Sequence, residues 1–209
     1  MKINEILEKL DKMIPNPKCE LNYNKDYELL IATVLSAQCT DVRVNKVTSV
    51  LFDKYDILSL SEADINDIEC IIYSCGNYKK KSLYLKEISK SLVNNYNGVV
   101  PNNREYLESL PGVGRKTTNV VLSNLFNVPA IAVDTHVDRV SKRLGLANTK
   151  DGVLKVEEKL MKKLPKEKWS RTHHQLVLFG RYTCKSQNPE CDKCLLKDYC
   201  KYYKKINKK

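Results

Sequence analysis

The stretch of sequence that decides the fold is Leu110-Pro111-Gly112-Val113-Gly114-Arg115-Lys116-Thr117. A helical segment ends at its first residue, and an apolar-periodic segment follows it over residues 120–126. The pattern predicts a helix, a tight glycine turn and a second helix. Glycines let the backbone approach a ligand closely, and the first turn of the second helix points N–H groups outward. We therefore expect residues 112–115 to form a seat for a phosphate backbone, one that does not read base sequence.

Lys116 lies in the first turn of the second helix of this hairpin. The positive end of the helix macrodipole and the neighbouring Arg115 both disfavour its protonated form. A lysine amine of this kind is a nucleophile toward a carbonyl or a sugar C1′ carbon, and it can form a Schiff base. The plainer alternative is a solvated lysine that only binds phosphate.

Asp134 follows the short apolar run of residues 130–133 and opens the next expected helix. Asp is strongly preferred at helix N-caps, so this carboxylate can serve as a cap alone. A carboxylate that faces the Lys116 amine would instead stabilise positive charge at a sugar and help to move protons.

The charge of the chain is concentrated in its second part. Residues 1–128 contain 16 Lys and Arg and 16 Asp and Glu, whereas residues 129–209 contain 20 against 9 and so carry the whole net charge of +11. Such a basic segment favours a polyanionic partner through counterion release. The alternative is a solubilising surface with a frayed lysine-rich tail over Lys201–Lys209.

The composition indicates a globular protein. With 209 residues and 42% hydrophobic content, the chain can bury a core in one large or two small domains. No apolar run is long enough to cross a bilayer, and residues 1–14 form an amphipathic stripe unlike a signal peptide. We expect a soluble, cytoplasmic protein, associated with the nucleoid if the source is bacterial.

Helical periodicity dominates the sequence, which predicts an all-α fold. Leu29–Leu35 is apolar all round, which favours a central helix surrounded by amphipathic ones. Ser61 and Asn102 are typical helix-start residues. The expected helices lie near residues 3–14, 27–38, 41–54, 62–74, 79–96, 103–110, 115–127, 134–145, 151–164 and 169–182.

The eight cysteines fall into two groups. Four are scattered (Cys19, Cys39, Cys70 and Cys75), and we assign them no function because such residues are usually small buried hydrophobes. The other four crowd together as Cys184-x6-Cys191-x2-Cys194-x5-Cys200, which indicates one metal centre. Spacing alone leaves structural zinc and an iron–sulfur cluster as alternatives.

Several motifs taken together resemble one family. They are the hairpin of residues 110–117, Val133-Asp134-Thr135-His136, the four terminal cysteines, Ser36-Ala37-Gln38-Cys39-Thr40-Asp41, and His174 through Gly180–Cys184. This combination is similar to the helix-hairpin-helix DNA glycosylase/AP lyase superfamily, and within it to its iron–sulfur branch, the endonuclease III family. The resemblance covers nearly the whole chain.

The resemblance implies a two-lobed all-α fold of the helix-hairpin-helix glycosylase type. A six-helix barrel domain of residues 19–128 would contain the hairpin, and an iron–sulfur cluster domain would combine residues 1–18 and 129–209. Lys116 would be the amine that attacks C1′ and Asp134 the assisting carboxylate. Cys184, Cys191, Cys194 and Cys200 would hold a [4Fe–4S] cluster, since the six-two-five spacing is that of the family.

The resemblance also implies a set of DNA contacts. Gln38 would fill the space that a flipped nucleotide leaves, and His136 and residues 112–115 would contact DNA. The family often has an apolar wedge where this chain has Asn77, so Asn77 is a departure that bears on opposite-base preference.

The implied function is that of a bifunctional glycosylase and AP lyase. It would act as a monomer on double-stranded DNA with a damaged base or an abasic site, excise oxidised pyrimidines and cleave 3′ to the site by β-elimination. One alternative is an adenine-mismatch glycosylase of the same superfamily, which generally lacks a lysine at position 116 and carries an extra C-terminal domain. The other is a noncatalytic helix-hairpin-helix DNA-binding protein with a zinc-stabilised end.

Overall fold

The structure, a computed structural model, describes residues 3–207, and every regular element in that range is a helix. This confirms the all-α prediction. No helix in residues 3–207 is long and apolar enough to span a membrane. The contacts divide the chain into two compact units, one formed by Cys19–Phe126 and the other by Met1–Lys18 together with Asn127–Lys209.

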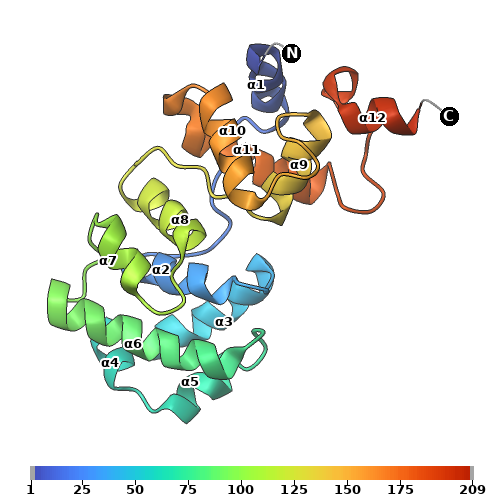
Figure 1. The fold of residues 1–209 in the computed structure, drawn as a ribbon. Coiled ribbons are helices and arrows are strands. Elements are labelled where there is room, and N and C mark those ends of the chain that lie inside the picture. The colour runs from blue at the N-terminus through green and yellow to red at the C-terminus, as the bar shows by residue number, and fades with distance from the viewer. Residues whose placement is uncertain (1–2, 208–209) are drawn as a thin grey trace. The chain divides into compact units, whose positions relative to one another are not determined.

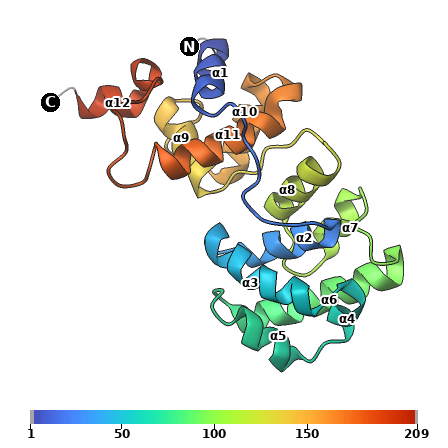
Figure 2. The ribbon, with the colours of Figure 1, turned by 180° about the vertical axis from the view of Figure 1, so that it is seen from behind.

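The unit Cys19–Phe126 is built around one buried helix, as the sequence predicts. Residues 27–35 of α2 are all buried, and α2 packs against α3, α6 and α8 (Figure 1, Figure 2). A helix surrounded on every side gains from apolar residues on every face, which is why the stretch Leu29–Leu35 carries no polar stripe. The helices of this unit are α2 (Asp26–Leu35), α3 (Asp41–Lys54), α4 (Ile57–Glu62), α5 (Ile65–Ile72), α6 (Tyr78–Tyr96), α7 (Arg104–Ser109) and α8 (Arg115–Leu125).

The helix expected over residues 62–74 is present as α5 but is shorter, and it is preceded by α4, which was not predicted. Asp56 caps α4 in a reciprocal box with Ser59, and the side chain of Asp64 accepts from the Asn66 N–H to begin α5. The expected start residue Ser61 lies inside α4, and α7 is capped by Asn103 and not by Asn102. Each observed cap is a side chain that accepts from an amide two or three residues ahead.

The second unit combines both ends of the chain around α9 and α11, which pack against each other (Figure 1, Figure 2). Apolar residues of α1, α9, α10 and α11 form its core, in which Phe179 is the largest fully buried side chain. Part of the expected frayed tail is helical. The helices of this unit are α1 (Ile3–Met13), α9 (Thr135–Leu144), α10 (Val153–Lys163), α11 (Trp169–Tyr182) and α12 (Lys201–Ile206), with short 3-10 turns at Lys166–Lys168 and Lys197–Tyr199.

Helix α1 is fastened to α11 by a carboxylate at its C-terminal end. Asp11 Oδ1 accepts hydrogen bonds from Arg171 Nε at 2.9 Å and from Gln175 Nε2 at 2.8 Å. These hydrogen bonds add to the stabilisation that α1 gains from the burial of Ile6 and Leu10. The hydrogen bond from Arg171 lowers the pKa of Asp11 below its usual 3.8, so its contribution to stability is present above that pH and is lost as the pH falls through the lowered pKa.

We expect Asp11→Asn to reduce the free energy of unfolding at pH 7 by about 0.5–1 kcal/mol, a small value because both partners are more than one-third exposed. Urea unfolding of both proteins across the acid range would measure it. The difference should shrink as the pH falls from 3.8 through the lowered pKa of Asp11, below which the wild-type carboxyl of the folded protein is neutral as well. A difference that is independent of pH would contradict the assignment.

Candidate active site and cysteine cavity

The hairpin between α7 and α8 has the predicted form. Leu110 ends α7, the turn passes through Gly112, and Gly114 is the N-cap of α8. Val113 anchors the turn, because its side chain is buried and its N–H donates to Leu110 O at 3.1 Å. Gly112 has φ +74°, and a Cβ there would lie 2.5 Å from the Tyr84 ring. Glycine is therefore required at 112 by both conformation and space.

Gly114 is a different case. Its backbone is extended, with φ −105°, and a Cβ there would meet nothing within 4 Å. The space beside Gly114 is thus open, and the amides of the first turn of α8, which have no partner inside the helix, are the groups that a ligand arriving there would meet.

We expect Gly112→Ala to reduce the free energy of unfolding by about 1–3 kcal/mol, since it adds backbone strain and a clash with Tyr84. Gly114→Ala, two residues away on the same turn, is the matched control and should change stability by less than about 0.5 kcal/mol. Thermal and denaturant unfolding of the two variants would measure this. Equal effects would show that the turn tolerates a side chain at 112.

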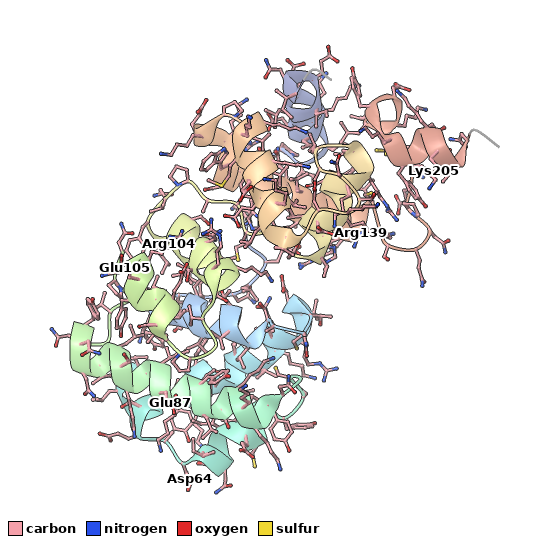
Figure 3. The ribbon with its side chains drawn as sticks, in the orientation of Figure 1. Asp64, Glu87, Arg104, Glu105, Arg139 and Lys205 are labelled. Carbon is pink, nitrogen blue, oxygen red and sulfur yellow. The ribbon has the colours of Figure 1, made fainter. Side chains whose placement is uncertain are left out.

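Lys116 is exposed in the first turn of α8, two residues after Gly114. The rest of α8 is fixed, because its residues 118–123 are buried. Arg104 of α7 adds a tie between the two helices by donating to Asn119 Oδ1 at 2.8 Å (Figure 3). Sequence reasoning missed Arg104, whose role depends on how α7 folds back on α8. The Lys116 amine therefore stands on a rigid helix.

Asp134 belongs to the other unit and is the N-cap of α9. Its Oδ1 accepts from the Val137 N–H at 2.7 Å, and the residue is half-buried. The capping interpretation of Asp134 is thus confirmed. A cap uses part of a carboxylate's accepting capacity, so capping and an interaction with a cation are compatible.

His136 is held in place by its own helix and by α11. Its Nδ1 lies 3.1 Å from Arg139 Nη2, and because a guanidinium only donates, Nδ1 accepts and the neutral ring carries its hydrogen on Nε2. Arg139 also donates to Gly180 O at 2.7 Å (Figure 3). Gly180 permits this close packing, since a Cβ there would lie 2.8 Å from His136 Cβ.

Gln38 and Asn77 lie in two adjoining turns of the unit Cys19–Phe126. Helix α2 ends at Leu35, three residues earlier than expected, so Gln38 is an exposed turn residue. Both residues have left-handed backbones, with φ 56° for Gln38 and 58° for Asn77. A Cβ on Gly76 would lie 3.4 Å from Gln38 O, which shows how closely the turns approach.

The four clustered cysteines line a single cavity in the C-terminal part of the second unit, with about 340 Å³ of atom-free space, part of it open to solvent. Three of the four sulfurs accept N–H groups. Arg143 Nη1 donates to Cys184 Sγ at 3.3 Å, and the amides of Leu196 and Tyr203 donate at 3.4 Å to Cys194 and Cys200 respectively. Sequence reasoning missed Arg143.

The chemistry of the cavity fits a positively charged metal centre. Burial, followed by the charges of neighbouring thiols, raises the pKa of Cys191, and burial also raises the pKa of Cys194. Thiols in such a place ionise when a metal neutralises them. Within residues 3–207, no three Cys, His, Asp or Glu side chains converge closely enough to hold a single metal ion.

Comparison with known proteins places the chain in a family. The family model described as HhH-GPD superfamily base excision DNA repair protein matches residues 31–166. Endonuclease III of Bacillus subtilis (strain 168) is 50% identical over 207 residues, covering 97% of this chain and 93% of the relative. Endonuclease III of Escherichia coli (strain K12) is 44% identical over 204 residues, covering 97% of this chain and 96% of the relative.

Solved structures agree with this placement. A non-covalent endonuclease III–DNA complex matches with a TM-score of 0.95 and 50% identity, covering 100% of this chain and 98% of that chain. A trapped endonuclease III–DNA covalent intermediate, an estranged-adenine complex, matches with a TM-score of 0.94 and 50% identity, covering 99% and 97%. The chain therefore belongs to the HhH-GPD superfamily of base excision DNA repair proteins and, within it, to the endonuclease III family of repair enzymes.

Proposed function

We propose that this chain is a bifunctional DNA glycosylase and AP lyase that excises oxidised pyrimidines from duplex DNA and cleaves 3′ to the abasic site. The observation that carries the proposal is the exposed Lys116 amine on a rigid helix, directly after the open glycine turn. Relatives that are 50% identical form DNA complexes, one of them a trapped covalent intermediate, which supports a covalent route. We further propose that the protein works in the cytoplasm, on nucleoid DNA, as a monomer.

In the proposed reaction the Lys116 Nζ lone pair attacks C1′. The C1′–N bond to the damaged base breaks, and the base leaves with that electron pair and a proton. The C1′–O4′ bond breaks as the sugar opens, and Nζ gives up two protons, one to the departing base and one to O4′, to form a C1′=N imine. Removal of a proton from C2′ then expels the 3′ phosphate, and water hydrolyses the imine to return the amine. Asp134 would stabilise the positive charge at the sugar and accept protons.

The remaining site residues would hold the DNA. The backbone of residues 112–115 would seat a phosphate at the start of α8, and His136 would offer its Nε2–H to the backbone as well. The damaged nucleotide must leave the stack before the amine can reach C1′. Gln38 would fill the vacated space, with Asn77 beside it in place of an apolar wedge.

Cys184, Cys191, Cys194 and Cys200 would hold a [4Fe–4S] cluster. The common cavity of the four sulfurs, the N–H donors to three of them and the membership of the endonuclease III family support this cofactor. Base excision moves no net electrons, so the cluster would serve as a rigid cross-link of the C-terminal segment. Lys185, Lys193 and Lys197 on that segment would thereby be fixed for phosphate contact.

The test is a duplex that carries one thymine glycol, incubated with the protein and borohydride, with an undamaged duplex as control. A covalent complex on the damaged duplex alone is expected, because borohydride reduces the imine to a stable amine. Base release without trapping would indicate a monofunctional glycosylase that uses water. If the protein binds the duplex but shows neither trapping nor base release, the noncatalytic DNA-binding alternative is supported.

A further inference from the structure

Lys81 in the first part of α6 is a buried lysine to which the proposed mechanism gives no task. Only 5% of it is exposed. Its ammonium donates to Leu35 O at 2.9 Å and to Ala37 O at 2.6 Å. Burial lowers its pKa from the usual 10.5, which reflects the cost of removing an ammonium group from water. Such a cost is tolerated where the charge does something that an apolar side chain cannot do.

The two carbonyls that Lys81 binds lie one and three residues before Gln38. Leu35 is the last residue of α2, where the helix carries a partial negative charge and carbonyls without a partner inside the helix. Ala37 is bonded to Gln38, so the bond to its carbonyl fixes the peptide plane from which Gln38 departs. Gln38 itself has a left-handed φ of 56°, which a non-glycine residue adopts only when its surroundings impose it.

Lys81 also belongs to the helix that begins at Asn77. Asn77 is the N-cap of α6, with a φ of 58°, and Lys81 follows one turn later. The same ammonium therefore connects the Asn77 turn to the Gln38 turn. Two further contacts lie at this junction, namely Cys39 Sγ at 3.7 Å from Cys75 Sγ and the close approach of Gly76 to Gln38 O.

We propose that Lys81 is a positioning residue that locks the Gln38 and Asn77 turns into one rigid element, so that both enter the DNA together when the damaged nucleotide leaves the stack. This inference rests on the proposed function, because it gives Gln38 and Asn77 their task. Lys81 does not touch the reacting atoms. It acts only through the backbone before Gln38.

The test compares two rates under single-turnover conditions, with enzyme in excess. One is base excision from a thymine glycol duplex, in which the vacated space must be filled. The other is β-elimination at an abasic site in a single-stranded oligonucleotide, which has no paired stack to fill. We expect Lys81→Met to lower the first rate by about 10- to 100-fold, the scale of a misplaced positioning group, and to leave the second unchanged. Gln38→Ala should show the same split.

A matched control comes from the same helix. Lys86 of α6 also donates to a backbone carbonyl, Ala63 O at 2.7 Å, but that carbonyl lies between α4 and α5. Lys86→Met should therefore show no split between the two rates. The double variant Lys81→Met/Gln38→Ala should be no slower on the duplex than Gln38→Ala alone, since both changes remove the same placement.

Equal loss of both rates in Lys81→Met, or additive effects in the double variant, would overturn the inference and leave Lys81 a purely structural residue. If Lys81→Met does not fold, the same two rates are compared for Lys81→Gln, because a glutamine side chain is too short to reach both carbonyls. Failure of the wild-type protein to form the borohydride adduct would count against the proposed function instead. The two failures are thus distinguishable.

Discussion

Lys116→Ala is expected to abolish the borohydride-trapped complex and to lower β-elimination by roughly a thousandfold or more, the scale on which removal of a covalent nucleophile acts. The reason is that no other group can form the C1′ imine from the start of α8. DNA affinity should fall only a few-fold, because the backbone seat at residues 112–115 remains. Denaturing gels of trapped and cleaved products, together with a binding titration, would measure both effects.

Lys90→Ala is the matched control for Lys116→Ala. Lys90 is an exposed lysine of the same unit, on α6. Its removal takes away the same charge and should leave trapping intact. A trapped complex that still forms with Lys116→Ala would show that another amine of the chain is the nucleophile.

Cys194→Ser is expected to remove the cofactor and to lower the free energy of unfolding by more than about 4 kcal/mol, the scale on which loss of a structural metal acts. Cys194 packs against the core of the second unit, and its sulfur accepts the Leu196 N–H, so the 3-10 turn at Lys197–Tyr199 and α12 depend on it. Iron and sulfide content, visible absorbance and denaturant unfolding would follow the loss.

Cys70→Ser serves as the control for Cys194→Ser, because Cys70 is exposed on α5 in the other unit. It should retain iron, colour and stability. Zinc in place of iron in the purified wild-type protein would refute the iron–sulfur assignment and would require the sulfurs to move together around one ion.

Much of the fold could be predicted because its signals are local. The stretch Leu29–Leu35 is apolar except for Thr33 and lies in the buried helix, and Gly112 and Gly114 mark the hairpin turn as expected. Helix α4 escaped prediction because it has only six residues and no apolar repeat of helical length, although Asp56 and Ser59 offered a capping signal.

The two catalytic candidates, Lys116 and Asp134, lie close together in the sequence. The residues that hold the Gln38 turn in place are far apart in the sequence. Helix α2 was expected to continue to residue 38, but it ends at Leu35. There the ammonium of Lys81, 46 residues later in the chain, donates a hydrogen bond to the Leu35 carbonyl. Lys81 looks like any surface lysine in a run of three, Lys79–Lys81, and only tertiary packing makes it buried. Long-range polar contacts of this kind leave no local pattern to read.

The fastening of α1 to α11 has a consequence for the order in which the protein is made. The ribosome completes α1 first, yet the partners of Asp11 are Arg171 and Gln175, about 160 residues later. The whole unit Cys19–Phe126 is synthesised between them and can fold as it emerges. The nascent α1 therefore waits with Ile6 and Leu10 uncovered, as a segment for molecular chaperones to shield until the last third of the chain arrives.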